Sequence, residues 1–87
     1  MVRKVSKEKL AQAIMILNQI YEDRTVPKNV KEAVKNARAA LENESLEVSI
    51  RINKALHELE KISEDPNVSA FTRTQIWNVV SLLESNE

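Results

Sequence analysis

Residues 62–84 read ISEDPNVSAFTRTQIWNVVSLLE and contain the sole Trp, the sole Phe and one of the two Pro residues of the chain. A short polar turn that includes Pro66 stands ahead of a run whose apolar residues recur every three or four positions. Because the residue before a proline is disfavoured in the helical region, a preceding helix has to end near Asp65. The segment therefore predicts the end of one helix, a tight turn and a second helix.

A related pattern occurs earlier in the chain at an offset of 42 residues, the separation of Ala13 from Ala55. The identical pairs at this offset are Ala13/Ala55, Leu17/Leu59, Ile20/Ile62, Glu22-Asp23/Glu64-Asp65, Val26/Val68, Asn36/Asn78 and Leu41-Glu42/Leu83-Glu84. Two amphipathic helices match at some apolar positions by chance, but not readily at an acidic pair and the valine that follows it. The sequence therefore predicts two copies of one helical hairpin, with a period close to that of two-helix repeats.

Apolar periodicity predicts four helices, over residues 7–22, about 27–42, about 46–64 and about 70–85. Ser6 and Ser69 are suitable N-caps for the first and last helices, and either Asn43 or Ser45 suits the third. Pro27 fits the first turn of the second helix, where its missing N–H is no loss. Residues 1–5 are basic and aperiodic, so we expect them to be frayed.

One apolar face of each expected helix is predicted to form the core. The core positions are Leu10, Ala13, Ile14, Leu17, Ile20 and Tyr21 in the first helix, Val30, Val34, Ala37 and Leu41 in the second, Val48, Ile52, Ala55, Leu56, Leu59 and Ile62 in the third, and Thr72, Ile76, Val79, Val80 and Leu83 in the fourth. Short connections favour a closed bundle, whereas an open solenoid generally needs at least three repeats. We therefore predict an all-α, antiparallel four-helix bundle built from two repeated helical hairpins, as a single domain over residues 1–87.

Composition limits the possible functions. With 43% hydrophobic and 30% charged residues, the chain is typical of one soluble globular domain. The absence of Gly excludes a P-loop, a dinucleotide-binding fingerprint and a nucleophile elbow. The absence of Cys excludes disulfides and thiolate metal sites and fits a reducing compartment. No apolar run approaches the roughly 20 residues of a membrane span, and the start lacks a signal-peptide pattern. A cytoplasmic protein without a membrane segment is expected.

The motif Asp65-Pro66-Asn67, followed by Thr72-Arg73-Thr74 and Ile76-Trp77, resembles the archaeal uncharacterised protein family 0147. The resemblance extends over about residues 9–84. The family pattern has Pro where this chain has Ser69, and often His where it has Phe71. The first difference exchanges one good helix start for another, and the second argues against any function that needs a histidine in this turn. The resemblance implies an all-helical bundle and leaves the activity open.

An acidic pair follows the first helix and another follows the third, so both pairs are expected at one end of the bundle. Carboxylates at a helix C-terminus oppose the helix dipole, so their repetition needs a reason. They either accept from the N–H groups that open the next helix, pair with Lys31 and Arg73, or together bind a cation. The lack of calcium-loop spacing favours a structural role. The possible partner-binding residues at this end are Glu22, Asp23, Glu64, Asp65, Arg73 and Trp77.

Some apolar residues fall outside the main helical stripes. Leu46 and Ile50 form one line, and Phe71 and Leu82 share a back face of the last helix. An apolar patch on so small a protein suggests a partner surface, and a two-fold dimer is the commonest arrangement. The alternative is ordinary scattered surface hydrophobes. The leading hypothesis is therefore a small interaction module that binds a protein partner or itself.

Nucleic-acid binding and catalysis are the competing functions. Lys28, Lys31, Arg73 and Trp77 near the turn end are the residues that nucleic acid would contact, with Arg73 expected against the Trp77 indole. The 13 basic and 13 acidic residues balance, so the basic excess typical of such proteins is missing. His57, the sole histidine, lacks a coupled acid–base set and is expected on a solvated helix face. We expect no catalytic, cofactor-binding or metal-binding residues.

Overall fold

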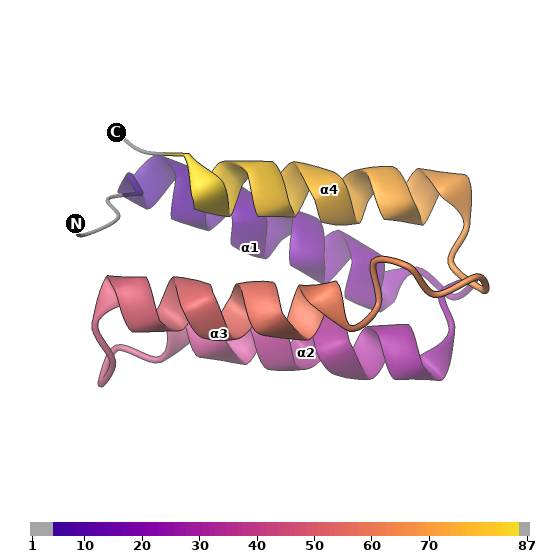
Figure 1. Cartoon of the computed structure of the whole chain (residues 1–87), viewed down its shortest axis with the longest axis horizontal. Coiled ribbons are helices and arrows are strands. Elements are labelled where there is room, and N and C mark those ends of the chain that lie inside the picture. The colour runs from indigo at the N-terminus through magenta and orange to yellow at the C-terminus, as the bar shows by residue number, and fades with distance from the viewer. Residues whose placement is uncertain (1–4, 86–87) are drawn as a thin grey trace.

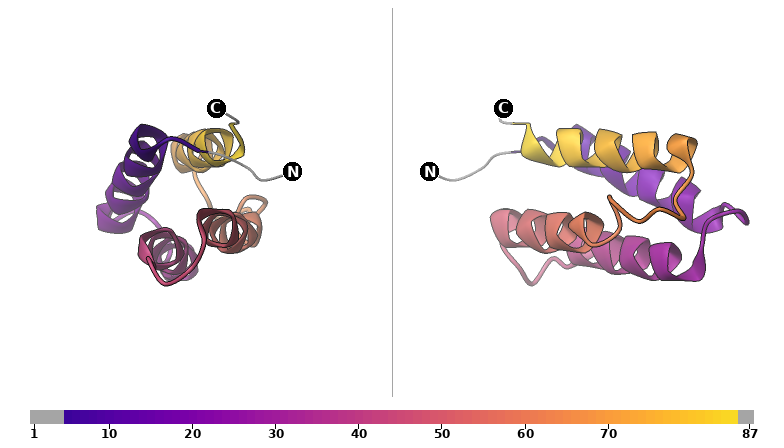
Figure 2. Two further views of the ribbon diagram at one scale, coloured as in Figure 1. Left: turned by 90° about the vertical axis from the view of Figure 1, so that its left-hand side faces the viewer. Right: turned by 45° about the vertical axis from the view of Figure 1, so that its right-hand side comes forward.

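The computed structural model describes residues 5–85 and contains four helices. They are α1 (Lys7–Glu22), α2 (Lys28–Glu42), α3 (Val48–Glu60) and α4 (Ala70–Glu84). Successive helices run in opposite directions along the long axis (Figure 1). Seen end-on, they form a ring in which α1 lies between α2 and α4 (Figure 2). Residues 5–85 contain no strand, so the predicted all-α, antiparallel four-helix fold is confirmed.

Side-chain caps open α1 and α4 as predicted. Ser6 Oγ accepts a 3.2 Å hydrogen bond from the Lys9 N–H, and Ser69 Oγ accepts one of the same length from the Thr72 N–H. Pro27 is the N-cap residue of α2 rather than its first helical residue. The caps made by Ser6 and Ser69 satisfy N–H groups that have no partner inside the helix. These helix starts are therefore dictated by local sequence.

The prediction for α3 was wrong at both ends. The helix begins at Val48, after Glu47, and ends at Glu60, whereas residues 46–64 were expected. Neither expected cap operates, because Asn43 Oδ1 accepts from both the N–H and the hydroxyl of Ser45, at 3.1 and 2.6 Å. The two side chains stabilise the loop instead of the helix start.

All three loops share one hydrogen-bonded turn. Its first residue is Asp23, Asn43 or Asp65, whose side-chain Oδ1 accepts from the N–H two positions on, at 2.9, 3.1 and 2.8 Å respectively. The carbonyl oxygen of the same residue accepts from the N–H three positions on, at 3.2, 3.1 and 3.1 Å. Asx turns of this kind suit Asp and Asn. The duplication of a hairpin stays a prediction, because the loop between its two proposed copies has the same geometry as the loops inside them.

The core follows the predicted faces closely. The predicted positions that are buried are Ala13, Leu17, Ile20, Val30, Val34, Ala37, Leu41, Ile52, Ala55, Leu59, Ile62, Thr72, Ile76, Val79 and Leu83. Val26, Ala33 and Val68 are buried as well, although they were not predicted for the core. Leu10 and Ile14 were predicted for the core but are only partly buried. Tyr21 is a wrong assignment, because it lies at the surface, where the Arg38 guanidinium stands 5.5 Å from the centre of its ring. Val5 packs against the core although it was expected to be frayed. The rest of that segment lies outside the described residues.

The four helices are not packed equally closely around the ring. α3 and α4 are neighbours, yet they make the least extensive contact of the four adjacent helix pairs. Residues 61–69 connect them, a longer link than residues 23–27 or 43–47 in the other two loops. The longer link lets α4 pack chiefly against α1. Val48, Leu56 and Val80, all predicted for the core, are consequently only partly buried.

Candidate protein-binding groove between α3 and α4

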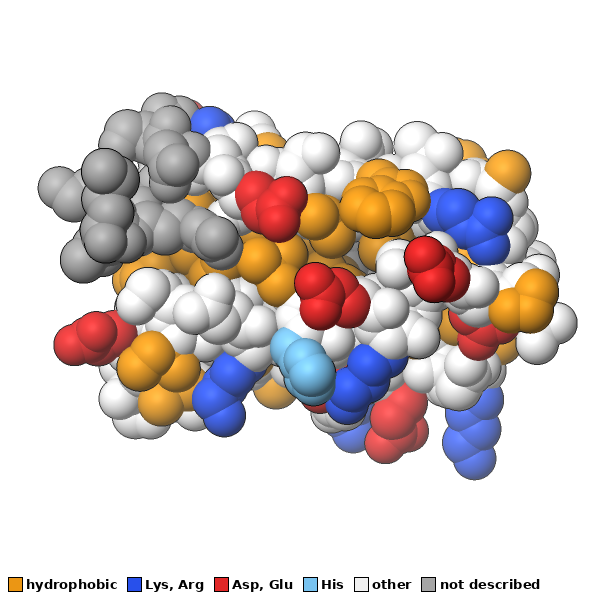
Figure 3. Space-filling model, in the orientation of Figure 1, with side chains coloured by type: hydrophobic (Ala, Val, Ile, Leu, Met, Phe, Trp, Pro, Cys, Tyr) orange, Lys and Arg blue, Asp and Glu red, His pale blue; other side chains and the backbone are white. Residues whose placement is uncertain are grey.

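The α3–α4 groove is an apolar hollow on the loosely packed side of the bundle. Leu56 and Leu59 form its α3 side, and Trp77 and Val80 form its α4 side. Figure 3 shows the hydrophobic side chains as a band that follows the seam between the two helices. The hollow encloses about 120 Å³. Leu59 is fully buried, whereas 51% of Trp77 is exposed. The groove thus combines a core residue with a large, accessible aromatic.

Helical spacing explains why these side chains meet. Residues three, four and seven positions apart share one face of a helix. Trp77, Val80 and Glu84 follow this spacing on α4. On α3, Leu56 and Glu60 are one turn apart, and Ser63 follows in the adjoining turn. On each wall the apolar residues come first along the chain, and the polar residues follow them.

Two carboxylates border the groove, Glu60 from α3 and Glu84 from α4. Figure 3 shows acidic side chains on both sides of the hydrophobic band. Within residues 5–85 the ion pairs are Lys61–Glu58, with 3.1 Å between Nζ and Oε2, and Arg38–Glu42, with 3.9 Å between Nε and Oε1. Neither rim carboxylate is paired there. The groove consequently carries a local negative charge on a chain that is neutral overall.

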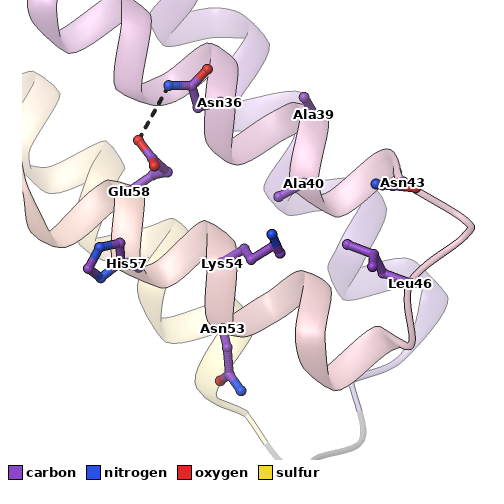
Figure 4. A pocket seen from close by; sticks show the side chains of 9 residues that line it. All are labelled: Asn36, Ala39, Ala40, Asn43, Leu46, Asn53, Lys54, His57 and Glu58. Carbon is purple, nitrogen blue, oxygen red and sulfur yellow. Dashed lines mark hydrogen bonds between the residues drawn. The ribbon is translucent and has the colours of Figure 1, made fainter.

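A larger and more polar hollow of about 500 Å³ lies between α2 and α3 (Figure 4). Glu58 reaches across it and accepts a 3.4 Å hydrogen bond from the Asn36 amide. Lys61 also donates to Glu58, at 3.1 Å. His57, on the rim, points away from α2 and is exposed, as predicted. No coupled acid–base pair is formed here, and the described residues give no positive sign of catalysis.

The acidic turn end contains the predicted carboxylates, but they serve their own loops. Asp23 accepts from the N–H and hydroxyl of Thr25, at 2.9 and 2.7 Å. These bonds lower its pKa, with a smaller contribution from the charge of Lys31. The expectation that such carboxylates reach the N–H groups of the next helix is wrong, because the bonded N–H lies in the loop. Glu22 and Glu64 are exposed.

Asp65 is held in a similar way. Its carboxylate accepts from the Asn67 N–H at 2.8 Å and from the Asn29 side-chain amide at 2.7 Å. The hydrogen bond from Asn67 lowers the pKa of Asp65 most, followed by the hydrogen bond from Asn29. The charge of Arg73 lowers this pKa further, by a smaller amount. Within residues 5–85 no group of three or more His, Asp or Glu side chains is arranged to hold a metal ion. The hydrogen bonds account for the repeated aspartates without a ligand.

The residues predicted for nucleic acid come from two helices, Lys28 and Lys31 from the first turn of α2 and Arg73 and Trp77 from α4. Arg73 Nη2 donates to the carbonyl oxygen of Asp65 at 2.9 Å, and Arg73 Nε is buried. The guanidinium is thus directed at its own loop. The expected cation–π contact between Arg73 and Trp77 is not formed. Within residues 5–85 the cation–π contact is between Arg38 and the Tyr21 ring. Trp77 belongs to the α3–α4 groove, whereas Lys28 and Lys31 begin α2.

The residues predicted for self-association are also dispersed. Leu46 lies in the α2–α3 loop and Ile50 in the first turn of α3, at the end of the bundle opposite Phe71 (Figure 1). Phe71 is 68% exposed. Leu82 packs partly against the core and lines a shallow hollow with Ile16 between α4 and α1. Ile50 and Phe71 are therefore exposed as predicted, whereas Leu46 and Leu82 are partly buried. The prediction missed Leu56 and Val80 as partly exposed residues because their spacing matched the core.

The fold and the groove define a small antiparallel helical bundle with an open, apolar seam between α3 and α4. The chain belongs to the uncharacterised protein family UPF0147, whose pattern matches residues 1–85, and this confirms the resemblance predicted from the sequence. A UPF0147 protein of the archaeon Sulfurisphaera tokodaii is 42% identical over 80 residues, which are 92% of this chain and 90% of the relative. The UPF0147 protein MJ1419 of Methanocaldococcus jannaschii is 42% identical over 81 residues, 93% of this chain and 87% of the relative.

Two crystal structures are closely similar. The protein of unknown function MMP1188 is 45% identical, with a TM-score of 0.88 and 99% of each chain covered. A UPF0147 protein from Thermoplasma acidophilum is 31% identical, with a TM-score of 0.85, covering 90% of this chain and 92% of that one. The fold is thus that of an archaeal family whose function is unknown.

Proposed function

We propose that the protein is a non-enzymatic interaction module that binds another protein through the α3–α4 groove. The observation that carries the proposal is Trp77, half exposed beside the apolar side chains of Leu56 and Val80. Tryptophan is enriched among the residues that dominate binding energy at interfaces. Covering this seam removes apolar surface from water, which favours association.

The size of the groove argues against a small-molecule substrate. Pockets for cofactors and metabolites usually enclose about 300–1,000 Å³, compared with about 120 Å³ here. The ionisable groups that line the hollow are Glu60 and Glu84, and within residues 5–85 neither has a partner that would make it a general acid or base. A protein partner fits these dimensions better. A cytoplasmic location is part of the proposal and fits the absence of cysteine.

A pull-down with matched variants tests the proposal. The tagged protein is incubated with nuclease-treated lysate of its source cell, together with Trp77→Ala, Val80→Glu and the control Phe71→Ser. Phe71 is more exposed than Trp77 and lies outside the groove, so the control removes a surface hydrophobe of similar character. Far-ultraviolet circular dichroism verifies that each variant is folded.

We expect wild type and Phe71→Ser to retain the same proteins, and both groove variants to lose them. Equal retention by all four proteins would reject the groove as the binding site. Capture that appears only when the nuclease treatment is omitted, and that weakens steeply with salt, would instead support nucleic-acid binding.

A further inference from the structure

We infer that the occupant of the α3–α4 groove is an amphipathic helix of another protein, with one apolar anchor side chain and a Lys or Arg one turn away on either side. The inference rests on the proposed function and specifies the chemistry of the partner. Three features of the groove support it: its volume, its charged rim and the geometry of its walls.

The volume sets the size of the anchor. A cavity of about 150 Å³ with aliphatic walls holds one benzene-sized group, and the α3–α4 groove encloses about 120 Å³ between Leu56, Leu59, Val80 and Trp77. One Leu, Ile or Phe side chain matches this space. A single apolar side chain in a pocket, surrounded by polar contacts, is the usual arrangement of a binding hot spot.

The rim sets the charge of the partner. Glu60 and Glu84 stand on opposite walls, and neither forms an ion pair within residues 5–85. A partner with cations on both sides of its anchor would pair with both carboxylates, whereas an acidic partner would be repelled. The carboxylates are exposed, so each pair adds only modest affinity. Their contribution is chiefly selectivity for a basic partner.

The walls set the conformation of the partner. α3 and α4 are antiparallel neighbours (Figure 1), and the α3–α4 groove lies between them. A third helix packs into such a groove by inserting its side-chain ridge. Residues three or four positions apart share one helical face, so the anchor and its two flanking cations all reach the groove.

Within residues 5–85, the exposed apolar residues of a second copy of this chain do not provide such a helix. The residues three and four positions from exposed Met15 are uncharged, namely Ala11, Gln12, Asn18 and Gln19. Those that follow Phe71 at the same spacing in α4, Thr74 and Gln75, are uncharged as well. Ile50 has Lys54 four positions on, but Glu47 three positions back. A partner of different sequence therefore fits the rim better than self-association.

The test uses synthetic helical peptides without Trp. Three peptides share one apolar face with a Leu anchor and carry Lys, Gln or Glu on both flanks, and a fourth is the Lys peptide with a central Pro. Trp77 is the sole Trp of the protein and lines the groove, so its fluorescence reports occupancy directly. The peptides are titrated into wild type and into Glu60→Lys/Glu84→Lys. The control Glu32→Lys/Glu44→Lys makes the same change in net charge at exposed positions outside the groove.

We expect wild type and the control to bind the Lys peptide at least about tenfold more tightly than the Glu peptide, with the Gln peptide between them. The rim double variant should reverse this order, and the Pro peptide should not bind. Equal affinities for all flanks, an order unaffected by the rim variant, full binding of the Pro peptide or no binding of any peptide would each overturn the inference. If the peptide titration fails but Trp77→Ala and Val80→Glu still lose partners in the pull-down, the helical partner is rejected and the proposed protein binding through the groove is retained.

Discussion

The side-chain amide of Asn29 donates a 2.7 Å hydrogen bond to Oδ2 of Asp65, 36 residues further along the chain. The bond joins the first turn of α2 to the loop between α3 and α4. The α3–α4 loop is therefore tied to the start of α2, in addition to its own Asx turn. The same loop precedes the α4 wall of the α3–α4 groove, so its position bears on the shape of the groove.

Substitutions at the two residues separate these contributions. Asn29→Ala removes only the bond between α2 and the α3–α4 loop, and we expect it to lower the Tm by no more than about 5 °C because the bond is exposed. Asp65→Ala also removes the acceptor for the Asn67 N–H, so the decrease should be larger. Asp65→Asn keeps that acceptor and should fall between them. Thermal denaturation measures all three, and an equal decrease for Asn29→Ala and Asp65→Ala would contradict the role of the Asx turn.

Stability should decline in acid because of the two loop aspartates. The pKa values of Asp23 and Asp65 are lowered from the ordinary value of 3.8 by hydrogen bonds to the ionised carboxylates. As the pH falls below that value, the unfolded chain binds protons before the folded chain does. The stabilisation is therefore complete above the ordinary pKa and disappears as the pH falls through the lowered values.

The measurement is the Tm of wild type and of Asp23→Asn/Asp65→Asn between about pH 7 and pH 2. The double variant should lose less stability than wild type across the acid range. Glu22→Gln/Glu64→Gln is the matched control, because these neighbouring carboxylates are exposed and accept no side-chain hydrogen bond in the described chain. If the Glu variant alone flattened the profile, the assignment to the aspartates would be wrong.

Leu59 links the core to the floor of the α3–α4 groove. Its side chain is fully buried, so Leu59→Ala should destabilise the fold by about 2–5 kcal/mol. That is a large part of the roughly 5–15 kcal/mol that stabilises a typical domain. The exposed neighbour His57 is the control, and His57→Ala should change the free energy of unfolding by less than about 0.5 kcal/mol. Urea denaturation gives both values, and similar values would contradict the packing.

Self-association through Phe71 and Leu82 remains a prediction from the sequence. Light scattering over a wide concentration range determines the mass of wild type, of Leu82→Glu and of Phe71→Ser. Phe71→Ser is the cleaner variant, because Leu82 also packs against the core and its replacement destabilises the monomer. Dimers that both variants disrupt would support the prediction. A wild-type monomer at high concentration would reject it and would leave the α3–α4 groove to a different protein.

Much of the fold was predictable because it depends on local interactions. The spacing of Leu17, Ile20 and the other core residues follows the helical period, and the hydroxyls of Ser6 and Ser69 satisfy N–H groups only three positions away. The shared loop of Asp23, Asn43 and Asp65 was only partly recognised. Its signal, an Asp or Asn followed by Thr, Ser or Asn two positions on and by Val or Leu three positions on, was present in all three loops.

The candidate site was not predictable in the same way. Leu56 and Val80 have core spacing, and only the wider separation of α3 and α4 leaves them at the surface beside Trp77. Arg73 lies one helical turn before Trp77, but its guanidinium donates a hydrogen bond to the carbonyl oxygen of Asp65. The helices, two of their caps and the buried faces follow from the local sequence, since these depend on residues within a turn or two of each other. Which helix pair stays open, and which charges face the opening, follows from the packing of all four helices, because that packing sets the distance between each pair.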